Sequence, residues 1–225
     1  MKANFSKKKM ALAVSLGLVG AGFSNPALSA WNAGTMHNTP ISAHILKISI
    51  NENALDGAEK FVDAIADQGI GFLSDSNLSD QKRKSEFQKL LKNNFDMNTI
   101  ARFALGRYWK TASQAQRDEY MKLFETMILN VYSSRFSEYK GEKLSVEGSR
   151  PEGKNDILVN STVAPENGQQ IKVDWRVRLK NGQYKIVDVI VEGVSMSLTQ
   201  RSDFSSVIQR GGGDINVLLD HLRQQ

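Results

Sequence analysis

The spacing of hydrophobic residues changes near Gly141 from a helical to an alternating pattern, and this change most constrains the fold. Before it, apolar residues recur at three- and four-residue steps, as in amphipathic helices. After it, every second residue from 171 to 179 is apolar, as in a strand with one buried face. We therefore expect an α+β protein, in which an antiparallel sheet of about four strands is curved and covered on one face by helices.

Capping and turn signals divide these two regions into elements. Ser113 opens the longest helix with the Ser-x-x-Gln form of a capping box, and Gly106 and Gly141 are suited to helix ends. Asn181-Gly182 is the preferred two-residue turn of a β-hairpin. The predicted helices are 53 to about 71, 80–94, 97–105, 114–139, 203–209 and 215–222, and the predicted strands are 144–146, 157–163, 171–179 and 184–198, the last broken at Gly193.

The N-terminus has the form of a secretory signal. Lysines 7–9 precede an apolar or small-residue run at 10–22, which is too short to span a membrane, since a spanning helix needs ~20 apolar residues. Small residues near Ala30 suit cleavage on either side of it. We expect residues 1–30 to be a signal peptide, 31–50 a flexible arm and 51–225 a single domain of an exported, soluble protein.

The charge of the chain excludes a polybasic nucleic-acid binder. The formal net charge of +5 comes largely from lysines in the first 30 residues, a segment without an acidic residue. The remainder carries 25 basic and 24 acidic residues, so no nucleic acid is expected as a partner. Since the sequence has no cysteine, disulfides and thiolate chemistry are excluded as well.

Catalytic and metal-binding patterns are sparse. His37, His44 and His221 are far apart and form no metal-ligand spacing, so neither a metal nor a cofactor is expected. Asp188 or Glu192 could act as a general base if it points into the sheet, while Asp188 could equally pair with Arg201. The structural role is the more common one, so no catalytic residue is expected.

The chain has more apolar surface than one core face needs. The apolar residues of the predicted helix 114–139 cover an arc of roughly 240°, against ~100° or slightly more for an ordinary surface helix, and the strand 187–191 is apolar on both faces. Such elements must be covered on two sides, either by wrapped helices or by an apolar ligand in a cavity. Arg135 lies in that arc and could bind a phosphate or pair with a carboxylate.

Three blocks of the sequence resemble one family. They are Arg102-Phe103-Ala104-Leu105-Gly106-Arg107-Tyr108-Trp109, the spacing from Phe124 to Gly141-Glu142, and Val187 to Ser195 followed by Arg201, Asp203 and Phe204. The chain resembles the MlaC (toluene-tolerance) family of periplasmic phospholipid-binding proteins over most of its length from about Ala54. It departs from the family pattern at Tyr184, where tryptophan is usual, and at Gln200, where an aromatic residue is usual.

The resemblance implies a periplasmic shuttle that carries glycerophospholipid between an outer-membrane lipoprotein complex and an inner-membrane ABC transporter complex, and so maintains outer-membrane lipid asymmetry. It implies an α+β fold in which a twisted antiparallel sheet of about four strands is wrapped by helices around an apolar cavity. It also implies a monomer without stable membrane insertion or enzymatic activity. Another lipid such as a hopanoid, or an enzyme using Asp188 or Glu192, are the alternatives. From periodicity, the residues expected to line the lipid site are Phe103, Phe124, Met127, Ile128, Val131, Tyr132, Arg135, Val173, Trp175, Val177, Val189, Val191 and Met196.

Overall fold

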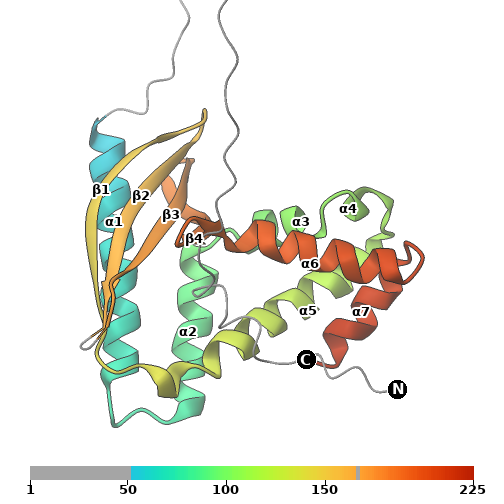
Figure 1. The fold of residues 1–225 in the computed structure, drawn as a ribbon, viewed down its shortest axis with the longest axis horizontal. Helices are drawn as coiled ribbons and strands as arrows, with labels where there is room; N and C mark the ends of the chain where they lie inside the picture. The colour runs from blue at the N-terminus through green and yellow to red at the C-terminus, as the bar shows by residue number, and fades with distance from the viewer. Residues whose placement is uncertain (1–51, 166–167) are drawn as a thin grey trace, which may run out of the picture. The chain divides into compact units, whose positions relative to one another are not determined.

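Helices precede and follow a single antiparallel sheet, as the hydrophobic pattern predicts (Figure 1). The computed structural model describes residues 52–165 and 168–225, which belong to one compact unit. The expected signal peptide 1–30 and arm 31–50 lie outside the described residues. The helices are α1 (Glu52–Ser74), α2 (Asp80–Asn94), α3 (Met97–Leu105), α4 (Tyr108–Thr111), α5 (Gln114–Ser133), the 3₁₀ helix η2 (Phe136–Glu138), α6 (Met196–Arg210) and α7 (Ile215–Arg223).

The described strands form a meander in which each strand pairs with the next. They are β1 (Lys143–Glu152), β2 (Asp156–Ala164), β3 (Ile171–Lys180), β4 (Gln183–Val191) and the short β5 (Val194–Ser195), in the spatial order β1-β2-β3-β4-β5. The sheet thus has five strands where about four were expected. Asn181 and Gly182 join β3 to β4 with φ angles of 53° and 74°, so the predicted two-residue hairpin turn is confirmed.

Four predicted boundaries are wrong. β1 runs on to Glu152, and α6 begins at Met196 rather than near residue 203. The break expected at Gly193 is confirmed, since Glu192 and Gly193 turn the chain with φ angles of 51° and 78°, but the strand then ends at Ser195 rather than at residue 198, because the Ser195 side chain caps α6. The helix expected over 114–139 is α5, which ends at Ser133 and is therefore shorter than α1. There the Ser134 hydroxyl donates to the Val131 carbonyl, a local bond that competes with continued helix, and η2 follows.

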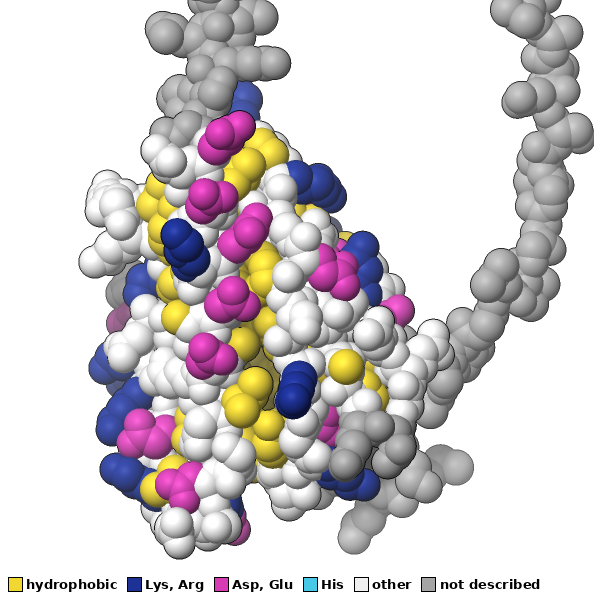
Figure 2. Space-filling model, turned by 90° about the vertical axis from the view of Figure 1, so that its left-hand side faces the viewer, with side chains coloured by type: hydrophobic (Ala, Val, Ile, Leu, Met, Phe, Trp, Pro, Cys, Tyr) yellow, Lys and Arg dark blue, Asp and Glu magenta, His cyan; other side chains and the backbone are white. Residues whose placement is uncertain are grey.

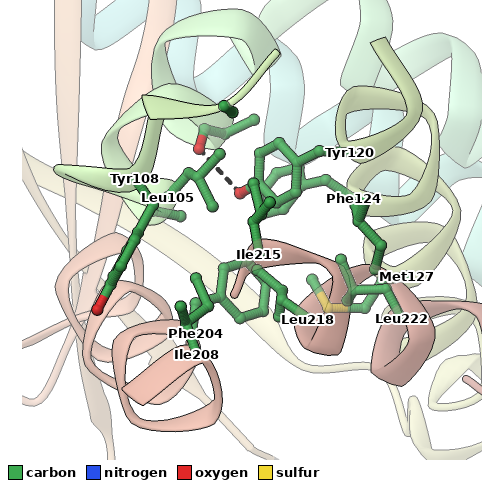
Figure 3. Packing of buried hydrophobic residues seen from close by; sticks show 14 residues of the cluster. Leu105, Tyr108, Tyr120, Phe124, Met127, Phe204, Ile208, Ile215, Leu218 and Leu222 are labelled. Atoms are coloured by element: carbon green, nitrogen blue, oxygen red, sulfur yellow. Dashed lines mark hydrogen bonds between the residues drawn. The ribbon is translucent and has the colours of Figure 1, made fainter. Parts of the chain in front are cut away.

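The C-terminal helices and α5 form a closed core of their own (Figure 3). Phe124 and Tyr120 of α5 pack against Phe204 of α6, and the Tyr120 hydroxyl donates to the Ala101 carbonyl at 2.9 Å. Burial raises the pKa of the Tyr120 phenol well above its ordinary value, which keeps this donor protonated. α5 packs mainly against α7, α2 and α3, so the expectation that it is covered on two sides is confirmed.

α1 and α2 cover the inner face of the sheet. α1 lies along β1 and reaches β2 and β3, while α2 lies against α1, α5 and β4. Tyr184 of β4 fastens α1 to the sheet, because its hydroxyl donates to the Ala54 carbonyl at 3.1 Å and its ring lies 5.8 Å from that of Phe61. Gly57 permits this approach, since a Cβ atom there would lie 2.3 Å from the Tyr184 hydroxyl oxygen.

Gly57→Ala is therefore expected to destabilise the protein, although alanine favours a helix interior over glycine by ~1 kcal/mol. The added methyl group must displace Tyr184 or α1, so we expect a loss of ~1–3 kcal/mol in the free energy of unfolding, measured by urea denaturation. Gly71→Ala in the same helix is the matched control, because nothing lies within 4 Å of its Cβ position, and this variant should gain stability. Equal gains in both variants would contradict the close approach.

Candidate functional site

The apolar residues between α1, α2 and the inner face of the sheet are less completely buried than those of the helical core. We call this region the sheet-side interior and define it by two clusters, one around Val62 and Val177 and one around Ile65 and Ile186. The first cluster has five buried and six partly buried hydrophobic residues. The second has four buried and eight partly buried ones. The helical core has fourteen buried and eight partly buried residues. The sheet-side interior is thus the apolar region of the described fold in which the larger share of the hydrophobic residues stays partly exposed.

Aromatic rings make up much of this interior. Phe136 of η2 contacts Phe87 of α2 and Phe72 of α1 edge to face, with ring centroids 5.3 Å and 6.0 Å apart. Trp175 of β3 belongs to both clusters and therefore lies where the two meet. Rings held edge to face offer large apolar surfaces without hydrogen-bonding requirements of their own.

The polar atoms next to Trp175 are satisfied within the protein. Its indole N–H donates to the Ser161 hydroxyl oxygen at 3.0 Å, and that hydroxyl donates in turn to the Val173 carbonyl at 2.6 Å. Ser161 is fully buried. Because these groups are paired with one another, they leave no unpaired polar atom next to the Trp175 ring.

A seam between α1 and the edge strand β1 leads toward this interior. Figure 2 views the side on which α1 and β1 lie in Figure 1, and it shows hydrophobic side chains in a hollowed seam beside a row of acidic ones. Val146 of β1 and Leu55 of α1 are partly buried hydrophobic residues of this region. The Ser149 hydroxyl donates to the Glu59 carboxylate at 2.7 Å and ties the two elements together. Hydrophobic residues of the sheet-side interior thus reach the surface along this seam.

Arg135 does not point into an apolar arc in this structure. Its guanidinium donates to Glu138 at 3.1 Å, and its side chain is 40% exposed. The neighbouring Tyr132 ring contacts Phe87, with centroids 6.4 Å apart, and burial raises the pKa of the Tyr132 phenol, an effect that the Arg135 charge partly offsets. Arg135 thus lies at the surface end of the sheet-side interior, with a carboxylate competing for its charge.

The residues expected to line a lipid site fall into separate parts of the fold. Trp175, Val177 and Val189 lie in the sheet-side interior. Phe124 and Met127 are buried in the helical core, with Ile128 and Val131 packed against it. Phe103 is exposed beneath Arg201, while Val173 is buried and Val191 and Met196 are partly buried where the strands meet α6.

Sequence reasoning missed the contribution of α1 and α2 to this interior. Phe61, Phe72 and Phe87 line it, yet none of them was among the residues expected to line the lipid site. The available signal was the number of large aromatic residues on these two amphipathic helices.

A separate cleft opens between α2, α3 and α5. It has a volume of about 450 Å³, an apolar floor that includes Leu91, Met121 and Phe124, and lysines 92, 122 and 185 at its rim. Its floor belongs partly to the helical core. It is the alternative location for an apolar ligand.

The two acids considered as general bases have structural partners. Asp188 accepts hydrogen bonds from the Val189 N–H, the Ser197 N–H and the Ser195 hydroxyl at 3.0, 3.0 and 2.6 Å. Glu192 accepts from the Lys172 N–H across the β3–β4 end. The Asp188–Arg201 pair is wrong, because the Arg201 guanidinium lies over the Phe103 ring instead. Within residues 52–165 and 168–225 no acidic or histidine cluster could hold a metal ion.

The fold and its interior define a class: an α+β protein whose antiparallel sheet is covered by two helices over a partly buried apolar interior. The chain belongs to the MlaC protein family, whose family model matches residues 63–224. None of the helices in the described part of the chain has the length and hydropathy to cross a bilayer.

Known proteins agree with this assignment. The intermembrane phospholipid transport system binding protein MlaC of Haemophilus influenzae is 26% identical over 124 residues, which are 53% of this chain and 57% of that protein. The toluene tolerance protein ttg2D of Pseudomonas putida is 23% identical over 114 residues, 51% of this chain and 53% of that protein. The chain thus matches a little over half the length of these relatives.

A solved structure shares the fold. The phospholipid-binding protein of Ralstonia solanacearum, solved in complex with a phospholipid, matches with a TM-score of 0.65 and 21% identity. The match covers 74% of this chain and 95% of that one. The expected family and the α+β fold class are therefore confirmed.

Proposed function

We propose that this protein is a periplasmic carrier that holds the acyl chains of a glycerophospholipid in the sheet-side interior and leaves the head group at the surface. In this role it carries the lipid between an outer-membrane lipoprotein complex and an inner-membrane ABC transporter complex. Membership of the MlaC family and the phospholipid in the structural neighbour support the ligand class. The observation that carries the location is the excess of partly buried over buried apolar residues in this interior.

The energetics of a carrier fit an apolar wall without exposed hydrogen-bonding groups. Two chains of ~16 carbons gain roughly 25 kcal/mol by leaving water, at ~0.8 kcal/mol per CH₂. A lipid that leaves a bilayer is already in hydrocarbon, so the net free energy of transfer into such a wall is close to zero. The aromatic rings and aliphatic side chains of the sheet-side interior meet this requirement, because acyl chains interact with them about as favourably as with the bilayer. Trp175 and Ser161 add no polar atoms that the acyl chains would leave unpaired, since their hydrogen bonds are made within the protein.

The positive charge of Arg135, at the surface end of the sheet-side interior, suits the phosphate of a lipid head group. Arg135 lies beside Tyr132 and Phe136, and its planar guanidinium can bind a phosphate through two parallel hydrogen bonds. In the lipid-bound state the phosphate would replace the Glu138 carboxylate, an exposed partner that contributes little to stability.

Val146→Asp tests the location of the acyl chains. The residue lines the seam on β1, and a short carboxylate there cannot reach solvent by extending as lysine does, so we expect at least a tenfold loss of co-purified phospholipid. The readout is organic extraction of the purified protein followed by mass spectrometry. Ser145→Asp, on the opposite face of the same strand, adds the same charge and should retain the lipid.

Met121→Asp distinguishes the sheet-side interior from the cleft between α2, α3 and α5. Met121 lines that cleft and is partly buried. If Met121→Asp empties the protein while Val146→Asp remains loaded, the acyl chains occupy the cleft and our location is wrong. Mass spectrometry also identifies the ligand, so recovery of a lipid without a phosphate would contradict glycerophospholipid as the cargo.

A further inference from the structure

Four arginines stack on aromatic rings around the turn from α3 to α4. Arg102 and Arg117 lie over the Trp109 ring, at 5.1 Å and 5.4 Å from its centroid. Arg107 lies 5.1 Å from the Tyr108 ring centroid and Arg201 the same distance from that of Phe103. We call these side chains, together with Lys110, the basic–aromatic patch.

The α3 and α6 parts of this patch are contiguous. α3 packs against α6, and these helices lie side by side in Figure 1. A Cβ atom at Gly106, in the turn itself, would lie 3.0 Å from the Nε atom of Arg201, so the Arg201 side chain crosses the turn. The arginines therefore share one surface region and are not scattered over the molecule.

The patch is unbalanced in charge. The segment from Met97 to Arg117 carries four basic residues and no acidic one. In the described part of the chain, none of the five cations of the patch forms an ion pair with a carboxylate, whereas Arg178 and Arg223 do so elsewhere. Arg117 donates to the Trp109 and Lys110 carbonyls, and Arg107 donates one N–H to the Tyr108 hydroxyl. The guanidinium groups of Arg102 and Arg201 use their faces on rings, and their N–H edges, with the remaining N–H groups of Arg107, are left to bind an external anion.

Apolar side chains are exposed within the same region. Phe103 is 41% exposed, and Leu198, one helical turn before Arg201, is 57% exposed. Exposed aromatic and aliphatic residues beside basic ones are the combination found where proteins lie on the interface of an anionic bilayer. With few apolar residues and no spanning helix among the described elements, such contact is peripheral and reversible.

We propose that the basic–aromatic patch docks this protein on the surface of an anionic phospholipid bilayer. Arg102, Arg107, Arg201 and Lys110 bind lipid phosphates, and Phe103 and Leu198 enter the head-group layer. The docking does not depend on the lipid cargo, because the patch is built from α3, α4, α5 and α6 and not from the seam between α1 and β1.

The test is sedimentation with vesicles at low ionic strength, using the protein as it is purified from the cells that express it. Each basic residue near an anionic surface strengthens binding about fivefold, so the triple variant Arg102→Gln, Arg107→Gln, Lys110→Gln should bind phosphatidylglycerol vesicles about a hundredfold more weakly. The control is Lys143→Gln, Lys154→Gln, Lys180→Gln, which removes the same charge from exposed positions at the ends of the strands and should bind as the wild type does. Circular dichroism verifies that both variants are folded.

Three further measurements distinguish docking on an anionic bilayer from lipid carriage and from binding to an acidic protein. Phosphatidylcholine vesicles and high salt should abolish binding, because the interaction is electrostatic. Val146→Asp should sediment as the wild type does even when it carries no lipid, which separates docking from carriage. Equal binding of vesicles by the two triple variants would overturn the proposal. Binding of the wild type to polyglutamate but not to anionic vesicles would also overturn it, and would indicate an acidic protein partner.

Discussion

Phe124→Ala is expected to lower the free energy of unfolding by ~3–5 kcal/mol, the range for truncating a buried phenylalanine. Phe124 is 1% exposed and contacts the rings of Tyr120 and Phe204 at 5.8 Å and 6.2 Å between centroids. For a domain of this size, a loss of 4 kcal/mol lowers the Tm by roughly 8–16 °C. Urea denaturation and a thermal scan measure the two quantities.

Phe103→Ala is the matched control, since it makes the same substitution on the adjoining helix at an exposed site. The loss there should stay below ~1 kcal/mol, the value of a solvent-exposed cation–π contact. Both residues were expected from the sequence to line a lipid site. Because the structure places neither in the sheet-side interior, folded protein of either variant should retain its phospholipid, and specific loss of lipid from folded Phe124→Ala would favour the cleft.

Asp188→Ala is expected to destabilise the protein by ~3–4 kcal/mol. The carboxylate joins β4 to the start of α6 through two backbone N–H groups and the Ser195 hydroxyl. A hydrogen bond to a charged group contributes ~1.5–3 kcal/mol, and the buried Ser197 N–H would lose its partner. The negative charge also lies favourably at the N-terminus of α6.

The comparison for Asp188 is Asp203→Ala, an exposed position on the same helix α6, where we expect a change within ~0.5 kcal/mol. Denaturant midpoints of the two variants give the difference directly. A stable Asp188→Ala variant that has lost a chemical activity would instead assign Asp188 a catalytic role and contradict the structural one.

Local signals in the sequence were sufficient for most of the elements. The Ser113 capping box is formed with both of its hydrogen bonds, Asp96 caps α3, and Gly106 ends it with a φ of 60°. Asn181-Gly182 forms the expected hairpin turn. These features depend on neighbouring residues alone, so a single sequence contains the information that decides them.

Which elements pack against one another could not be predicted in the same way, because the contacting residues are far apart in the sequence. The apolar arc of α5 requires two-sided cover, but periodicity does not say whether a sheet or other helices provide it. The structure uses α2, α3 and α7, so Phe124 and Met127 lie in the helical core while α1 and α2 cover the sheet. The four-residue helix α4 was missed because so short a segment has no periodicity to detect.

The most direct test of the account is the amount of phospholipid in the wild-type protein. Extraction into organic solvent, quantification by mass spectrometry and comparison with the protein concentration give the molar ratio. We predict close to one phospholipid per chain, reduced at least tenfold by Val146→Asp and unchanged by Ser145→Asp. Wild-type protein that remains empty after incubation with phospholipid vesicles would contradict the proposed carrier.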